Sequence, residues 1–291
     1  MSNIFQAILM NAAEAAENLK KGAKAYMGDD GYLHCEVCHE PIEAEYPEEI
    51  RHLFPEGKRR PRMCKCDRDR DDAEKAEQKR QEALMRIDEL RREGMYSELY
   101  MESRFDRDDR RNEKVSRIAR KYAENFAEYA ENNVGIMLWG GVGTGKTFYA
   151  ACIANALIEQ YRTVIMATVT DLVSELTEDY GKNREWVLRR IAEADLLVLD
   201  DLGVERGTEY MQEHVYDIVN ERCNANKPLI VTTNLSPSDM ERETVDIKRR
   251  TYDRVRACCS PIKVDGESRR KEIGKGKTAL LRKLLEENDE Q

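Results

Sequence analysis

Eight consecutive residues in the middle of the chain have the types and spacing of a phosphate-binding loop. They are Gly140, Gly141, Val142, Gly143, Thr144, Gly145, Lys146 and Thr147, and they match the pattern G-x-x-x-x-G-K-[ST]. Glycines let successive backbone N–H groups point at a phosphate, and the start of a helix adds a favourable dipole. In this pattern the lysine reaches the β- and γ-phosphates and the threonine hydroxyl binds Mg²⁺. The loop therefore predicts a site for a nucleoside triphosphate, ATP, with Mg²⁺.

Polar residues that suit the rest of such a site follow two later apolar runs. Asp200 and Asp201 end one run, and Asn234 ends the next. Because ligands sit at the carboxyl ends of parallel strands, we expect these residues beside the glycine loop. We expect Asp200 to hold the Mg²⁺ shell, and Asp201 to orient or deprotonate the attacking water. Asn234 would hold that water against the γ-phosphate, and Glu205 is an alternative base.

Four cysteines stand in two close pairs near the N-terminus. They are Cys35 and Cys38 in C-x-x-C, and Cys64 and Cys66 in C-x-C. Two separated pairs of this kind make two knuckles around one tetrahedral Zn²⁺, and a segment with so little core needs a structural metal. The second pair is one residue shorter than the usual knuckle, so His34, His39 and His52 are spare candidate ligands.

Composition sets limits on the class of protein. The chain has 291 residues, 36% of them charged, and a net charge of −9. This charge excludes a wholly basic protein that coats nucleic acid, although the basic stretch 58–70 allows either a nucleic-acid contact or solvated surface. No apolar run approaches the ~18 residues of a membrane span, and residues 1–11 lack the basic start of an export signal. We expect a cytoplasmic protein without membrane contact, whose eight cysteines bind metal or stay free.

The elements that must position the glycine loop and the carboxylates alternate along the chain. Apolar runs predict strands at 134–139, 163–168, 195–200, 228–233 and 261–264. Helical patterns predict helices at 148–158, 171–178, 184–194, 209–224 and 248–259. Apolar strands that alternate with helices predict an α/β fold, with a five-stranded parallel sheet flanked by helices.

The first third of the chain predicts a separate module and a connection. Residues 1–27 form an amphipathic pattern, which suits either packing on its own domain or docking to a partner. Residues 71–94 predict a charged helix and residues 112–131 a helix with a better apolar stripe, and the segment between them offers Tyr96, Tyr100 or Phe105 to an adenine. The predicted domains are an N-terminal helix and Cys₄ zinc module for partner binding at 1–70, a helical linker at 71–111, the nucleotide domain at 112–275 and a C-terminal helix with an acidic tail at 276–291.

With its motifs in this order, the chain resembles the DnaC/DnaI/IstB group of AAA+ ATPases, especially bacterial and phage helicase loaders with an N-terminal zinc module. The resemblance covers about residues 95–275. Its specific parts are Asp200–Gly203 (DDLG), Thr232–Asn234 (TTN), Asp253–Arg254 and Ser268–Arg270. It implies an AAA+ P-loop NTPase fold, ATPase activity, and a helical insert at residues 171–194 that lines a path for single-stranded DNA.

The resemblance also implies roles for single residues. Asn234 would be the sensor-1 residue, Arg254 would act in trans on the ATP of a neighbouring copy, and Arg270 would be the sensor-2 arginine that binds the nucleotide. The chain has Ser-Arg-Arg where the family has Ser-Tyr-Arg, so Arg269 competes with Arg270 for that role. Asp201 is one methylene shorter than the Glu of fast AAA+ motors, so we expect slow hydrolysis that serves as a switch.

The leading hypothesis is an ATP-dependent loader that places the hexameric replicative helicase on single-stranded DNA and self-associates through Arg254. The alternative is an IstB-like transposition helper, which acts on DNA with a transposase. As far as the resemblance goes, that group lacks a Cys₄ module, so the cysteines favour the loader. A binding module with a vestigial ATPase is a third possibility, and the complete set of motifs argues against it.

Overall fold

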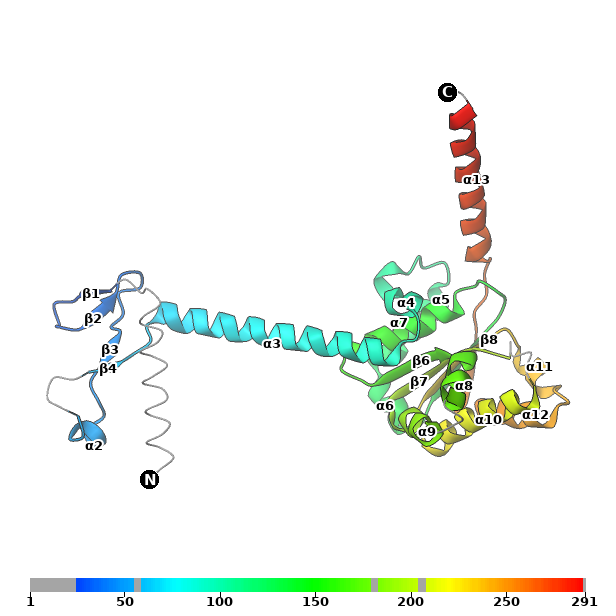
Figure 1. Cartoon of the computed structure of the whole chain (residues 1–291), viewed down its shortest axis with the longest axis horizontal. Helices are drawn as coiled ribbons and strands as arrows, with labels where there is room; N and C mark the ends of the chain where they lie inside the picture. Colours follow the sequence, from blue (N-terminus) through cyan, green and yellow to red (C-terminus); the bar gives the residue numbers. More distant parts are fainter. Residues whose placement is uncertain (1–24, 55–58, 179–182, 204–207, 290–291) are drawn as a thin grey trace. The chain divides into compact units, whose positions relative to one another are not determined.

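The computed structural model describes residues 25–54, 59–178, 183–203 and 208–289 (Figure 1). The chain divides into two compact units, Met1–Leu84 and Met85–Gln291, called unit 1 and unit 2 below. Most of the helix predicted at residues 1–27 lies outside the described residues, as does Glu205. Its last three residues do not continue a helix but form strand β1 (Ala25–Met27), because they pair with a second strand.

Unit 1 is built from short strands and turns. Strand β1 pairs antiparallel with β2 (Leu33–Cys35), and β3 (Glu43–Ala44) pairs with β4 (Arg60–Pro61). One turn of helix, α2 (Glu48–Arg51), lies between β3 and β4. Within residues 25–54 and 59–84, the buried apolar cluster comprises Cys35, Ile42 and Cys64. So small a core cannot by itself stabilise a fold, which is why the chemistry of its cysteines matters.

Helix α3 (Lys65–Gly94) begins in unit 1 and is thirty residues long. It starts six residues before the predicted position, so Cys66 lies in its first turn and it runs through the predicted boundary at residue 70. Only Leu90, Arg91 and Gly94 near its end are buried, because the rest of the sequence is almost wholly charged.

Unit 2 contains the predicted five-stranded parallel sheet. Its strands are β5 (Gly135–Trp139), β6 (Val164–Thr168), β7 (Leu196–Leu202), β8 (Leu229–Thr233) and β9 (Cys259–Lys263), in the order β6-β7-β8-β5-β9. All four neighbouring pairs are parallel. The fold class is thus confirmed, and each strand lies within two residues of its predicted bounds.

Helices cover both faces of this sheet (Figure 1). One apolar core joins the sheet to the end of α3, α4 (Glu98–Glu102), α5 (Glu113–Glu124), α6 (Phe126–Glu131) and α7 (Lys146–Ile158). The other core involves α8 (Val169–Thr177), α9 (Arg184–Glu193), α10 (Glu209–Asn224), α11 (Pro237–Glu241) and α12 (Asp246–Cys258). Burial on two faces explains why the strands are continuously apolar.

The structure differs from the prediction in several elements. The helix predicted at 112–131 is broken at Asn125 into α5 and α6, and α4 and α11 were not predicted. The last helix, α13 (Arg269–Asp289), starts before the predicted residue 276, so Arg269 and Arg270 lie in its first turn. The expectation of free thiols is wrong for one pair, because Cys223 in α10 forms a disulfide with Cys258 in α12. Among the described residues, no helix has an apolar stretch long enough for a lipid bilayer.

Arg222 near the end of α10 is fully buried and holds three segments together. Its guanidinium donates to the carbonyls of Ile191 and Ala194 at the end of α9 (2.9 and 2.7 Å), of Asp195 before β7 (2.9 Å) and of Pro228 before β8 (2.7 and 3.0 Å). The ends of helices and strands leave such carbonyls short of backbone donors, although the Pro228 carbonyl also accepts from the N–H of Leu197 (3.4 Å). Burial lowers the pKa of Arg222 to about 10, a value at which it stays protonated at neutral pH.

Arg222→Met should therefore lower the free energy of unfolding of unit 2 by about 3–5 kcal/mol, because several buried carbonyls lose their donors. Arg189→Met is the matched control, since Arg189 is exposed and forms an ion pair with Glu185 in its own helix; it should cost less than about 0.5 kcal/mol. Both tryptophans lie in unit 2, so urea unfolding followed by tryptophan fluorescence measures this difference. Equal unfolding midpoints for the two variants would contradict the prediction.

Candidate nucleotide site and cysteine cluster

A cavity of about 500 Å³ in unit 2 lies at the carboxyl ends of β5, β7 and β8. This volume is within the range of small-molecule sites. Its walls come from the glycine loop, the strand ends, α4 with the segment that follows it, and the start of α13. The lining residues are Leu99, Ser103, Arg107, Asp109, Val142, Gly143, Gly145, Lys146, Thr147, Phe148, Asp201, Asn234, Arg269 and Arg270.

The glycine loop has the backbone that its sequence requires. Gly140, Gly143 and Gly145 have φ values of 147°, 81° and 103°, a region that residues with a Cβ rarely adopt. A Cβ at Gly145 would also overlap the guanidinium of Arg269. The loop ends where α7 begins, so the unpaired N–H groups and the positive dipole end of a thirteen-residue helix face the cavity. This arrangement suits an anionic phosphate chain.

Lys146 is buried at the base of the cavity. Its Nζ donates to the carbonyls of Gly140 (3.0 Å) and Gly141 (2.8 Å) and to the side chain of Asn234 (2.8 Å). Burial lowers the pKa of Lys146, and the charges of Asp201 and Asp200 oppose that shift. Among the described residues, the hydrogen-bond partners of the ammonium are thus neutral, and a phosphate would supply a negative charge.

Asp200 and Thr147 lie together as the sequence predicts. Asp200 is buried, and its Oδ1 accepts from Thr147 Oγ1 (2.8 Å) and from Thr232 Oγ1 (2.6 Å). Its Oδ2 accepts from the hydroxyl of Tyr100 (3.0 Å). Carboxylate and hydroxyl oxygens are the ligand types that Mg²⁺ takes beside a bound phosphate, so these two side chains fit the ion.

Asp201 owes its position to a β-bulge in β7. Leu199 pairs with Val231 and Leu202 with Thr233, so Asp200 and Asp201 together lie opposite the single residue Thr232. Asp201 has a φ of 58°, and its N–H donates to Thr232 Oγ1 (3.0 Å). Because of the bulge, Asp200 faces Thr147 while Asp201 lines the cavity. Burial and then the Asp200 charge raise the pKa of Asp201, as expected for a carboxylate kept close to another.

The three candidate arginines have different surroundings. Arg269 forms an ion pair with Asp109 (2.5 Å), and its Nη1 donates to the carbonyl of Thr144 (3.2 Å). Arg270 lines the same cavity and is exposed there. Arg254 does not reach this cavity; its guanidinium donates to Asn224 Oδ1 (3.4 Å) beside a second cavity.

The sequence did not identify several residues around the nucleotide cavity. Thr232 was noted only as part of a motif, and Tyr100 only as an aromatic for an adenine, whereas its hydroxyl contacts Asp200 instead. Asp109 and Arg107 had no signal at all, because they lie on an irregular segment whose path depends on tertiary packing. None of Tyr96, Tyr100 and Phe105 is among the lining residues; the segment contributes Leu99 and Ser103 instead.

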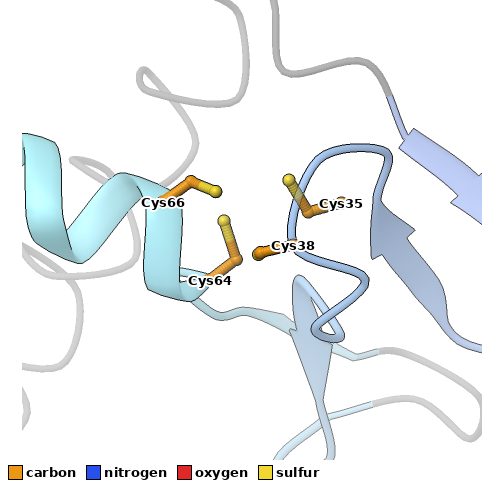
Figure 2. Close-up of side chains that lie close together, drawn as sticks. All are labelled: Cys35, Cys38, Cys64 and Cys66. Carbon is orange, nitrogen blue, oxygen red and sulfur yellow. The ribbon is translucent and has the colours of Figure 1, made fainter.

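The four cysteines of unit 1 converge (Figure 2). The Sγ atoms of Cys35, Cys38, Cys64 and Cys66 all lie within 4.8 Å of one another. Four thiolates at ~2.3 Å from a tetrahedral ion would be about 3.8 Å apart, so the cluster is close to the geometry that such an ion needs. The short C-x-C spacing is sufficient because Cys64 precedes α3 and Cys66 lies in its first turn.

Two of the three spare candidate histidines, His34 and His39, have other partners, and His52 is not part of the cysteine cluster. His34 contacts Asp30 (3.0 Å) and the carbonyl of His39 (2.8 Å) with its two ring nitrogens, and His39 contacts the hydroxyl of Tyr26 (3.0 Å). N–H groups of Cys66 and Glu40 lower the pKa of Cys38 to about 6, whereas burial raises that of Cys64 to about 12. Crowded thiols of this kind cannot all ionise without a cation, and a dication such as Zn²⁺ fits the donor set.

Comparisons with known proteins agree with this site. A family model described as IstB-like ATP binding protein matches residues 69–276. The chain is 32% identical over 142 residues to the replicative helicase loader DnaC of Escherichia coli (strain K12), which covers 47% of this chain and 55% of that protein. It is 30% identical over 147 residues to the replicative helicase loader DnaI of Bacillus subtilis (strain 168), which covers 47% of each. The chain thus spans about half the length of the curated relatives it matches.

A solved structure supports the fold. A candidate primosome component from Streptococcus pyogenes serotype M3 superimposes with a TM-score of 0.50 and 22% identity, over 60% of this chain and 94% of that one. Together with the sheet order and the glycine loop, this similarity supports an α/β AAA+ fold. Since the family model matches more than half of the chain, the protein belongs to the IstB-like ATP-binding family and is a homologue of the DnaC and DnaI helicase loaders.

Proposed function

We propose that this protein binds ATP with Mg²⁺ in the unit 2 cavity, hydrolyses it slowly, and uses this cycle to load a hexameric replicative helicase onto single-stranded DNA. The observation that carries the proposal is the convergence of Lys146, Thr147, Asp200, Asp201 and Asn234 at one edge of the sheet. Relatives named as replicative helicase loaders support the biological role.

Each residue then has a role that its surroundings suit. Lys146 leaves its carbonyl and amide partners to bind the β- and γ-phosphates, and Thr147 with Asp200 holds the Mg²⁺ shell. Mg²⁺, when bound, neutralises charge that develops on the transferred phosphoryl group. Asp201, which lies in the β-bulge and lines the cavity, orients or deprotonates the attacking water. Asn234 holds that water against the γ-phosphate.

Arg270 and Arg254 have separate roles in this proposal. Arg270 binds the nucleotide as the sensor arginine, because it lines the cavity while Arg269 is held by Asp109 and by the glycine loop. Arg254 acts in trans on the ATP of a second copy, since it lies outside its own cavity. The Cys₄ cluster binds a structural Zn²⁺, and unit 1 contacts the helicase.

The transposition helper is a second candidate function, and one observation favours it. The matching family model is the IstB-like one, and its matched range starts at residue 69, after the cysteine cluster. The ATPase motifs alone therefore do not separate the two functions, and the partner has to be tested directly.

The decisive experiment mixes the full chain with the hexameric helicase of its host, with and without ATP and single-stranded DNA. We expect a complex on size-exclusion chromatography, and ATP-dependent release of the helicase onto DNA. Lys146→Ala should bind ATP at least ~10-fold more weakly, a loss of about 1.4 kcal/mol, and should not complete this cycle. If no complex forms under any condition and the protein carries no zinc, the transposition helper becomes the better hypothesis.

Arg270→Ala should lower kcat by roughly 100-fold or more, because it removes a cation that contacts the bound nucleotide and stabilises charge in the transition state. Arg269→Ala should instead weaken ATP binding, because the glycine loop loses a side chain that holds it. Steady-state ATPase kinetics separate kcat from KM for the two variants. The opposite assignment, a kcat defect confined to Arg269→Ala, would show that Arg269 is the sensor.

The purified protein should carry about one Zn²⁺ per chain, measured by inductively coupled plasma mass spectrometry. Cys35→Ser should lose the metal and unfold unit 1, since closed zinc sites of this kind contribute much of the folding free energy. Cys223→Ser is the control, because Cys223 belongs to unit 2 and pairs with Cys258. Full zinc retention by Cys35→Ser would rule out a four-cysteine site.

A further inference from the structure

We propose that Tyr100 is a positioning residue for Asp200, and that it connects the magnesium site to the C-terminal end of α3. The inference rests on the proposed function only in assigning Asp200 to the Mg²⁺ shell. Tyr100 belongs to α4, outside the glycine loop and the strands that supply the other groups of the site.

The hydrogen bond from Tyr100 to Asp200 is the first observation behind this proposal. Asp200 is 4% exposed, so its carboxylate depends on protein donors rather than on water. Thr147 and Thr232 both donate to its Oδ1, and within the part of the chain that the structure describes the donor to its Oδ2 is Tyr100 (3.0 Å). Tyr100 therefore restricts the rotation of the Asp200 carboxylate about its Cβ–Cγ bond. This rotation sets the position at which a magnesium-bound water would contact the carboxylate.

The second step is that Tyr100 is itself held in place. Its side chain is 5% exposed, and its carbonyl accepts from Asn155 Nδ2 (2.7 Å). Asn155, in α7, is also buried and holds the carbonyl of Ser103 (2.8 Å). Asn155 Oδ1 accepts from Nε of Arg91, in the last turn of α3 (3.0 Å).

These contacts form a continuous buried chain from Asp200 through Tyr100 and Asn155 to Arg91. The chain is buried at every residue, so water does not screen its hydrogen bonds. The same segment lines the nucleotide cavity through Leu99 and Ser103. A change in the ligation of Asp200 therefore acts directly on residues 98–103 and on the last turn of α3.

Arg91 places its guanidinium between Asn155 and the carboxylate of Glu159 (3.5 Å). Its Nη2 has no hydrogen bond within the described residues. That atom is the one in the ion pair with Glu159, so the chain of contacts ends in an ion pair at the C-terminal end of α7.

The test is Tyr100→Phe in the full chain, which keeps the ring and removes only the hydroxyl. Tyr122→Phe is the matched control: Tyr122 is equally buried and donates to the Val134 carbonyl (2.7 Å) before β5. ATP binding is measured with a fluorescent analogue, first in EDTA and then during titration with Mg²⁺. Hydrogen exchange of residues 95–103 is followed with and without Mg²⁺.

Tyr100→Phe should bind the analogue as the native chain does in EDTA but need about tenfold more Mg²⁺ for the magnesium-dependent gain, about 1.4 kcal/mol. It should also lose the magnesium-dependent change in exchange at 95–103. Tyr122→Phe should show neither effect, at a similar loss of thermal stability. A magnesium dependence of Tyr100→Phe within twofold of the native chain, or an equal shift in Tyr122→Phe, overturns the inference. A native chain that binds no analogue with or without Mg²⁺ overturns the proposed function as well, which distinguishes the two failures.

Discussion

The parallel pairing of β5, β8 and β7 determines where almost every group around the nucleotide cavity lies. Leu138 pairs with Thr232 and Trp139 with Thr233, so the glycine loop after β5 starts beside the end of β8. The pairing of β7 with β8 then brings Asp200 to the same edge. Since all these strands run in one direction, their carboxyl ends cannot separate without breaking the sheet. The site is therefore as rigid as the buried ladder beneath it.

The β-bulge in β7 interrupts the regular pairing of β7 with β8 at Asp200 and Asp201. In a regular strand, consecutive side chains point to opposite faces of the sheet. Two neighbouring carboxylates would then lie on opposite faces. The extra residue opposite Thr232 changes their directions, and the Thr232 hydroxyl satisfies both the N–H of Asp201 and the carboxylate of Asp200. One threonine thus stabilises the irregular backbone and the acid beside it.

Segments outside the sheet complete the cavity by direct contacts with its polar groups. The ion pair of Arg269 with Asp109 joins the start of α13 to the segment before α5, and it lies against the glycine loop. Asn112 donates to the carbonyl of Asp265 (2.9 Å) and reinforces the same junction. On the other side, Tyr100 brings α4 to Asp200. The cavity is therefore sensitive to the position of elements that flank the sheet, a property suited to a switch.

The sequence by itself determined the glycine loop, the five strands and the carboxylate pair, because each depends on local types and on a hydrophobic pattern of fixed period. It also determined the Cys₄ cluster, since metal-ligating pairs are recognised by spacing. It could not determine the bulge at Asp201, the role of Arg222 or the contact of Tyr100 with Asp200. These depend on groups that lie between six and one hundred residues apart, and no periodicity connects them. Only the tertiary structure shows that Arg269 and Arg270 have different surroundings. The two side chains are chemically identical, and the ion pair of Arg269 with Asp109 distinguishes them.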